Sequence, residues 1–276
     1  MKVVLQGSFE TDFSSVNKLM SVNKTLSNAA VLEECIIDMQ RVDWFNAALC
    51  SFFKAFLRQR MAENRIVIRF LFNSTSPSNM KVRGIFERNG FFSGQVRDFY
   101  NTIFPVRDFR TIDVEIESFL KNMKEDFLDM DKFPFSEEST KGILRGLGEI
   151  FSNSQRHSES DWVYTSGQLF PNRNLGQVVF CITDVGVGIV KKVKTYMNNM
   201  LTSEDAINWA FEEGNTTKNG SGGLGLFSLK NIVEKNNGDL IVVSNDIYYD
   251  VLKKKMHKLV FDFTGTLVIV IMNRKG

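Results

Sequence analysis

Glu149 and Asn153 are spaced so that an α-helix would place both side chains on one face. They lie in the segment LGEIFSNSQRH, residues 147–157. A carboxylate in such a place can act as a general base toward water or a hydroxyl group. An amide oxygen one turn away can hold Mg²⁺, which prefers oxygen ligands and keeps several waters when it bridges phosphates. The same pair also fits a solvated helix face, so it does not by itself indicate a site.

A second group of chemically capable residues is Asp184-x-Gly186-x-Gly188, directly after the apolar run QVVFCIT. An Asp at the end of a buried strand costs free energy unless its carboxylate has a partner. That partner can be an exocyclic amino group such as the one on adenine. The glycines would let a flat ring lie against the backbone, because they carry no side chain. Gly265-Thr266, at the start of the last predicted strand, either joins this site or simply follows a turn.

Residues 220–225, GSGGLG, carry four glycines ahead of an amphipathic run. The string fits G-x-G-x-x-G, but a dinucleotide-binding loop must follow a buried strand, and the preceding residues EEGNTTKN are polar. The chain contains no Walker A string. The run that follows predicts a helix over residues 224–235, whose N-terminal amides would favour a phosphate. A flexible linker without a ligand is the alternative for this window.

In this order, the four segments resemble the GHKL ATP-binding fold of gyrase-type topoisomerases, heat-shock chaperones, histidine kinases and MutL-type repair proteins. GEIFSNSQRH resembles its N box, ITDVGVGI its first glycine box and GSGGLGLFSLKNIV its second, over about residues 110–276. The resemblance implies ATP and Mg²⁺ as ligands. By that resemblance Asn153 would coordinate Mg²⁺ and Asp184 would bind the adenine amino group, with Thr266 supporting Asp184 through water. Gly186 and Gly188 would line the adenine pocket. The phosphates would be wrapped by the glycines of the second box, Gly220, Gly222, Gly223 and Gly225.

The resemblance also implies a mobile ATP lid over residues 190–219. Lys218 in this segment either reaches the terminal phosphate or is solvated. Glu149 is the candidate general base, toward water in the hydrolysing GHKL enzymes and toward a serine hydroxyl in anti-sigma-factor serine kinases. The pattern Glu149-x-x-x-Asn153-x-x-x-His157 is similar to the N box of those kinases.

Autophosphorylation on histidine is not expected, because His157 and His257, the two histidines of the chain, both fall inside the predicted ATP-binding region. Histidine kinases carry their acceptor histidine on an upstream helix. Three functions therefore stay open: an ATPase that acts as a regulatory switch, a protein serine kinase that acts on a separate partner, and a module that binds ATP without catalysis.

The first 98 residues alternate strand-like and helix-like segments, which predicts a small α/β domain. Its helices are predicted over residues 13–30, 44–61 and 79–89. Residues 31–57 resemble the strand-to-helix core of STAS domains, the fold of anti-anti-sigma factors. The key position departs from that family, because Asp43 is followed by Trp44 and not by a phosphorylatable serine.

A connecting helical region is predicted over residues 99–131, and the ATP-binding domain over residues 132–276. Beyond the connecting region, helices are predicted over residues 139–155 and 224–235, and strands over residues 162–169, 177–183, 239–244, 259–263 and 266–272. The order of these elements is a helix, two strands, a variable segment, a helix and three strands. This order is typical of an α+β sandwich, such as the GHKL sandwich of the resemblance, and not of a doubly wound sheet.

Composition restricts the partners. The chain has 34 Lys and Arg against 32 Asp and Glu, a net charge of +2, which gives no electrostatic basis for nucleic acid or an anionic membrane. Cys35, Cys50 and Cys181 lie singly in apolar surroundings, which indicates free thiols in a reducing compartment. No apolar run approaches a membrane span. We expect a cytoplasmic protein with an unidentified protein partner, and a homodimer by analogy with GHKL proteins only.

Overall fold

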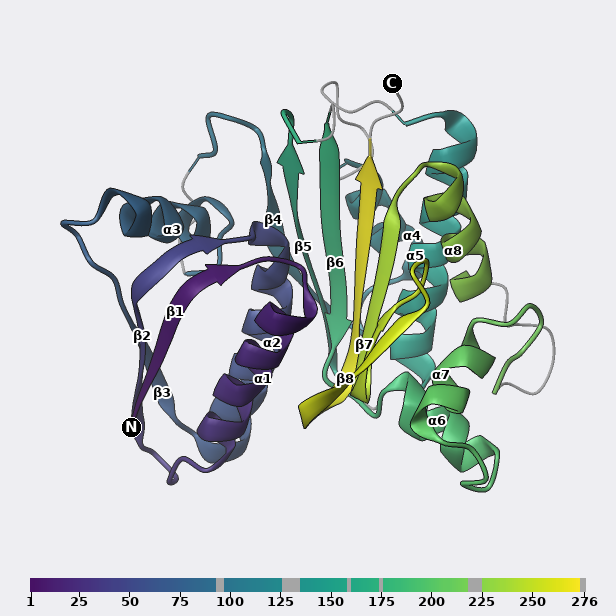
Figure 1. The fold of residues 1–276 in the computed structure, drawn as a ribbon, viewed down its shortest axis with the longest axis horizontal. Helices are drawn as coiled ribbons and strands as arrows, with labels where there is room; N and C mark the ends of the chain where they lie inside the picture. Colours follow the sequence, from purple (N-terminus) through teal and green to yellow (C-terminus); the bar gives the residue numbers. More distant parts are fainter. Residues whose placement is uncertain (93–96, 126–134, 158–159, 174–175, 218–224, 274–276) are drawn as a thin grey trace.

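The computed structural model describes residues 1–92, 97–125, 135–157, 160–173, 176–217 and 225–273. These residues form four layers, which Figure 1 shows side by side. A small parallel sheet comes first, then two helices, then a larger antiparallel sheet, and finally a second set of helices. The larger sheet therefore lies between two helical layers.

The first two layers come from the N-terminal part of the chain. Its elements are β1 (Lys2–Phe9), α1 (Phe13–Ser27), β2 (Glu34–Phe45), the 3-10 turn η1 (Ala47–Leu49), α2 (Cys50–Asn64), β3 (Val67–Leu71) and α3 (Pro77–Arg88). The strands are parallel in the order β1-β2-β3, and α1 and α2 connect them. The predicted alternation of strands and helices is confirmed for this unit.

Two helix starts in this unit show what local sequence does and does not decide. Helix α1 begins after Asp12, whose carboxylate accepts a hydrogen bond from the Ser15 N–H at 2.7 Å, as expected of an N-cap. The helix predicted over residues 44–61 begins later, at Cys50, because Trp44 and Phe45 continue β2 beside β1. Aromatic residues suit a strand as well as a helix, and pairing with β1 decides between them.

The larger sheet and the outer helices come from the rest of the chain. The elements are β4 (Ile103–Arg110), α4 (Ile116–Met123), α5 (Glu137–His157), β5 (Trp162–Phe170), β6 (Gln177–Asp184), α6 (Ile189–Tyr196), α7 (Ser203–Ala210), α8 (Gly225–Lys235), β7 (Asp239–Asp250) and β8 (Lys255–Asn273). The strand order is β4-β5-β6-β8-β7, and all neighbours are antiparallel. The predicted fold class is confirmed: an α/β unit precedes an α+β sandwich, consistent with the GHKL sandwich.

Details of this half differ from the prediction. Strand β4 was not predicted, although its residues pair along β5. The two strands predicted over residues 259–263 and 266–272 are parts of the single long strand β8, with Gly265 between them. A Cβ atom at Gly265 would collide with the backbone oxygen of Asp184, so this glycine allows β8 to run close to the end of β6.

Alternate residues of β6 enter two different apolar cores. Val179 and Cys181 pack in a cluster with residues of α1 and α2, whereas Phe180 and Ile182 pack in a cluster with residues of α5 and α8. Burial on both faces explains why this strand reads as a continuous apolar run. The N-terminal unit and the larger sheet thus share a core. The domain boundaries near residues 98 and 132 and the STAS resemblance stay predictions.

Buried hydrogen bonds also join the N-terminal unit to the sheet. The Ala47 N–H donates to Oε1 of Gln168 at 2.8 Å, and the Ser51 N–H donates to Oγ of Ser166 at 2.8 Å. The Ser166 hydroxyl in turn donates to the Ala48 carbonyl at 2.7 Å. Separation of the two parts would exchange these hydrogen bonds for bonds to water and would expose the shared apolar core, which costs free energy.

The three cysteines are buried and unpaired, as predicted. Burial raises the pKa of the Cys50 and Cys181 thiols well above the ordinary value, so these thiols stay protonated and unreactive. Within the described ranges, no helix is both long and apolar enough to cross a membrane.

Candidate functional site

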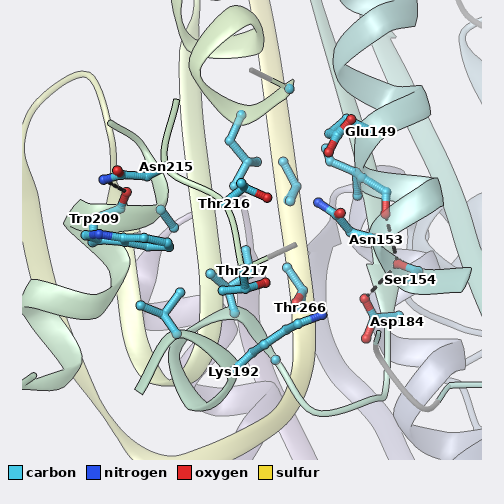
Figure 2. Close-up of a pocket in the computed structure, with 18 residues that line it drawn as sticks. Glu149, Asn153, Ser154, Asp184, Lys192, Trp209, Asn215, Thr216, Thr217 and Thr266 are labelled. Carbon is cyan, nitrogen blue, oxygen red and sulfur yellow. Dashed lines mark hydrogen bonds between the residues drawn. The ribbon is translucent and has the colours of Figure 1, made fainter. Parts of the chain in front are cut away.

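A cleft opens between α5, α8, the α6–α7 segment and the ends of β6 and β8 (Figure 2). Six of the predicted site residues line it: Glu149, Asn153, Asp184, Gly188, Gly225 and Thr266. The remaining wall is formed by Ile150, Ser154, Ile189, Lys192, Val193, Trp209, Ala210, Asn215, Thr216, Thr217, Leu226 and Val268. The predicted Lys218, Gly220, Gly222 and Gly223 lie outside the described residues. The segments quoted from the sequence therefore converge on one place.

Helix α5 brings Glu149 and Asn153 to the cleft on one face, as their spacing predicts. Both side chains are half-buried. A neighbouring stripe of the helix, which includes Ile143 and Leu147, packs in the apolar core and fixes the orientation of the helix about its axis. The carboxylate and the amide are thus presented to the cleft by a rigid element.

Helices α5 and α8 approach closely and run antiparallel. A Cβ atom at Gly146 would lie 2.8 Å from Cβ of Leu229, and a Cβ atom at Gly225 would collide with the Cβ and Cγ atoms of Glu149. Glycine at position 225 therefore has a packing reason: it lets the first turn of α8 touch the stem of Glu149. The predicted contact of Gly225 with phosphates stays a prediction.

Asp184 ends β6 with its carboxylate at the cleft and with 4% of its surface exposed. Its Oδ2 accepts a hydrogen bond from the Ser154 hydroxyl at 3.0 Å, and its Oδ1 accepts one from the Gly186 N–H at 2.9 Å. Thr266 pairs with Asp184 in the ladder between β8 and β6 and lines the cleft beside it. The predicted support of Asp184 by Thr266 through water stays a prediction.

Burial raises the pKa of the Asp184 carboxyl from 3.8 to about 6, against the opposing effect of its hydrogen bonds. The nearby ammonium of Lys192 also favours the charged form. A buried carboxylate that keeps a charge near neutral pH and lines a cleft is a strong hydrogen-bond acceptor for a ligand.

Gly186 and Gly188 follow Asp184 in the loop between β6 and α6. Gly186 donates its N–H to Asp184 and does not line the cleft. Gly188 lines the cleft and has a φ of +83°, a conformation that side chains disfavour. A Cβ atom there would lie 2.6 Å from Oδ1 of Asn245 and 2.8 Å from Oγ of Ser244. Gly188 is therefore required by how this loop sits against β7, and the contact of either glycine with an adenine ring stays a prediction.

The wall opposite α5 comes from the predicted lid segment, which contains two short helices. Lys192 of α6 extends across the floor of the cleft toward Thr266 and Asp184 (Figure 2). Trp209 of α7 faces the same space, and Asn215 donates to the Trp209 carbonyl at 3.0 Å, which holds the chain after α7 against this wall. Residues 190–217 of the predicted lid segment thus contribute side chains to the site.

Ser154 and Lys192 are the site residues that sequence reasoning missed most clearly. Ser154 falls on the buried stripe of α5, four residues after Ile150, and a polar side chain on an apolar stripe is a signal that it has a buried partner. Lys192 carries no comparable signal, because it lies in a lysine-rich segment that also fits a solvated helix. Its place depends on how α6 packs onto β7.

A metal site made by side chains alone is not found in the part of the chain that the structure describes: no group of three or more His, Cys, Asp or Glu could hold an ion there. Among the side chains with oxygen atoms that line the cleft, those of Asn153 and Glu149 lie one turn apart on α5. Such a small set of oxygen ligands fits Mg²⁺ that keeps waters and is held largely by the phosphates of a bound nucleotide.

Comparison with known proteins adds little. No family model and no curated protein matches the chain. Among solved structures, the chain is similar to the histidine kinase domain from Erythrobacter litoralis EL346 blue-light activated histidine kinase, with 19% identity, a TM-score of 0.26, and coverage of 49% of this chain and 44% of that chain. The chain thus spans less than half of the length of that structure. A likeness at this TM-score does not assign a fold or a function, so the site is interpreted from its own residues.

Proposed function

We propose that the cleft binds ATP with Mg²⁺ and that the protein is an ATPase that acts as a nucleotide-dependent regulatory switch. The observation that carries this proposal is the buried Asp184 carboxylate, held at the cleft by Ser154 and Gly186. An ionised carboxylate accepts about four hydrogen bonds, so acceptor capacity is left for a donor in the cleft. The exocyclic amino group of adenine is such a donor.

The phosphate end of the nucleotide would lie toward α5 and α8. The first turn of α8 borders the cleft at Gly225 and Leu226, and the N-terminus of a helix favours negative charge. Asn153 would supply one oxygen ligand to the metal. When bound, Mg²⁺ would neutralise phosphate charge and orient the terminal phosphate.

Glu149 would be the general base. In hydrolysis it accepts a proton from water while the water oxygen bonds to the terminal phosphorus and the bond from that phosphorus to the bridging oxygen breaks. The products are ADP and inorganic phosphate, and Glu149 then releases its proton to solvent. In a serine kinase the same proton would come from the hydroxyl group of a partner protein, and the N-box pattern around Asn153 supports this second candidate. A module that binds ATP without catalysis is the third.

Phosphate release from the full chain with Mg²⁺ and ATP tests the enzymatic part. Glu149→Gln keeps the shape of the side chain but removes the base, so the rate should fall by about 100-fold or more. Glu138→Gln is the matched control, because Glu138 lies on the same helix but is exposed and paired with Lys235 at 3.1 Å. Hydrolysis that survives Glu149→Gln would exclude Glu149 as the base.

The same preparation separates the alternatives. ATP binding without phosphate release, followed by transfer of labelled phosphate to a serine of a co-purified protein, would replace the switch by the kinase. Binding with neither release nor transfer would leave the non-catalytic module. Absence of ATP binding by calorimetry would contradict all three.

A further inference from the structure

The end of β7 and the beginning of β8 form a hairpin that contacts both the predicted lid and the N-terminal unit. We call residues 245–258 the bridging hairpin. The strand β7 bends at Asn245, which has a φ of +53°, and the register with β8 shifts at this point. The hairpin then folds back along β7, since the Val251 N–H donates to the Leu240 carbonyl at 2.8 Å.

The bend holds the start of helix α6, which directly follows the Asp184 to Gly188 segment. The Ile189 N–H donates to Oγ of Ser244 at 2.7 Å, and the Lys191 N–H donates to Oδ1 of Asn245 at 3.0 Å. Nδ2 of Asn245 also donates to the Val187 carbonyl at 3.1 Å. These bonds satisfy the first N–H groups of α6, which have no partner within the helix. They tie the cleft to the bridging hairpin.

One face of the hairpin packs on the rest of the lid segment. The rings of Tyr249 and Phe211 meet edge to face with centroids 5.8 Å apart. Ile247 and Val251, at alternate positions from Tyr249, are buried in the same apolar cluster as the lid residues. Both α6 and α7 contact β7. A displacement of α6 or α7 would therefore act on this face.

The other face packs on helix α1. The Phe13 ring stacks on the His257 ring at 4.6 Å and meets the Tyr248 ring edge to face at 5.6 Å. Just beyond the hairpin, the Val260 N–H donates to Oδ1 of Asn17 at 3.1 Å. Adjacent residues of one strand, Tyr248 and Tyr249, thus contact the N-terminal unit and the lid segment respectively.

We propose that the bridging hairpin couples the nucleotide cleft to the N-terminal unit, with Asn245 as a positioning residue for the segment that carries Asp184 and Gly188. This inference rests on the proposed function, because nucleotide binding is the event that is transmitted. A shift of α6 on binding displaces Asn245 through two side-chain hydrogen bonds, and the hairpin carries the displacement to Phe13. Coupling between two sites is reciprocal, so a change at Phe13 alters ATP affinity.

Hydrogen exchange of the full chain, with and without Mg²⁺ and a non-hydrolysable ATP analogue, tests the route from cleft to α1. Wild-type protein should gain protection at the start of α6, in the bridging hairpin and at the start of α1. Asn245→Gly keeps the left-handed backbone accessible but removes the side-chain hydrogen bonds to Val187 and Lys191. It should bind the nucleotide more weakly, because the segment of Asp184 and Gly188 loses this support, and at saturating nucleotide it should lose the protection of α1. Asn245→Asp, which keeps an acceptor for Lys191, should restore part of that protection.

The reverse direction is tested by ATP affinity, measured by calorimetry. Phe13→Leu removes the ring that stacks on His257 and should change the Kd for ATP by about fivefold, the lower end of ordinary couplings. Phe72→Leu is the matched control, because Phe72 is also half-buried among aromatic rings but contacts only rings of the N-terminal unit in the described structure.

The outcomes separate the coupling from the function on which it rests. Three results would each overturn the coupling while ATP binding stands. The first is wild-type protection that stops at α6, and the second is equal protection of α1 in Asn245→Gly and wild type. The third is an unchanged Kd for ATP in Phe13→Leu. Absence of ATP binding to the wild-type chain, with no protection at any segment, would overturn the proposed function and the coupling together.

Discussion

The Ser154 hydroxyl lies 3.0 Å from Oδ2 of Asp184, so the residue after Asn153 on α5 holds the carboxylate at the end of β6. The same hydroxyl lies 3.1 Å from the Ile150 carbonyl. A serine has one proton to donate, so it can donate to Asp184 when that group is ionised, and can accept from Asp184 and donate to Ile150 when that group is protonated. This pairing joins the two predicted motifs and suits a carboxyl group that titrates near neutral pH.

Ser154→Ala should therefore weaken ATP binding without unfolding the protein. Loss of a hydrogen bond to a buried carboxylate favours the neutral form of Asp184 and lowers its strength as an acceptor, by about 1.5 kcal/mol or roughly tenfold in Kd. Calorimetry at pH 7.5 measures the effect. Ser152→Ala is the control, because Ser152 is a similarly buried serine of α5 outside the cleft. Equal affinities for wild type and Ser154→Ala would show that this hydroxyl does not support the site.

ATP affinity should fall as the pH is lowered through 6. The pKa of the Asp184 carboxyl is raised by burial to about 6, and only the ionised form offers its lone pairs to an amino donor. Binding should therefore be constant above about pH 7 and weaken below pH 6. Calorimetry at several pH values should compare the Kd for ATP of wild type with that of Asp184→Asn, whose side chain at position 184 does not titrate. A flat profile for wild type would show that the charge of Asp184 is not used.

Asp184→Asn should stabilise the empty protein at neutral pH. The folded chain binds more protons at Asp184 than the unfolded chain between pH 3.8 and about 6, so this group lowers the free energy of unfolding as the pH rises through that window. Above it the ionised carboxylate destabilises the fold by about 2–3 kcal/mol, at ~1.4 kcal/mol per pKa unit. Urea unfolding at pH 8 should give a higher free energy of unfolding for Asp184→Asn than for wild type. At pH 4 most of this difference should vanish. A loss of stability at pH 8 would contradict the burial argument.

Gly225→Ala should destabilise the fold and disturb the cleft. The added methyl group would collide with the stem of Glu149 where α8 meets α5. Overpacking of this kind costs about 1–3 kcal/mol in the free energy of unfolding. Gly84→Ala is the control, because a Cβ atom there meets only the flexible end of Arg88 and alanine favours a helix. The urea midpoint of Gly225→Ala should fall below that of wild type, and the midpoint of Gly84→Ala should rise above it. Equal midpoints for the two variants would mean that α8 can shift away from Glu149 without cost.

Much of the cleft follows from local patterns. The spacing of Glu149 and Asn153 places both on one face of α5, and the Asp at the end of the apolar run QVVFCIT is the buried carboxylate of the cleft. Such features depend on residues a few positions apart, which one sequence displays directly. The ligand contacts given to the glycines do not follow from the pattern alone, because Gly188 and Gly225 also have packing reasons to be glycine.

The remainder depends on contacts between distant segments. Lys192 reaches the cleft because α6 packs on β7, and the bridging hairpin lies between the lid and α1 because β7 bends at Asn245. The shared core of the N-terminal unit and the larger sheet likewise joins residues more than 100 positions apart, such as Ser51 and Ser166. Periodicity within one segment says nothing about which face meets which neighbour, so these features needed the structure.

The binding of ATP to Asp184→Asn tests the central claim most directly. Calorimetry with Mg²⁺ at pH 7.5 should give a Kd at least about tenfold weaker than that of wild type, because the amide presents a donor where adenine needs an acceptor. Asp38→Asn, at a carboxylate that is 6% exposed and lies outside the cleft, should bind ATP as wild type does. Unchanged affinity in Asp184→Asn, with binding intact in the control, would contradict the adenine contact on which the account depends.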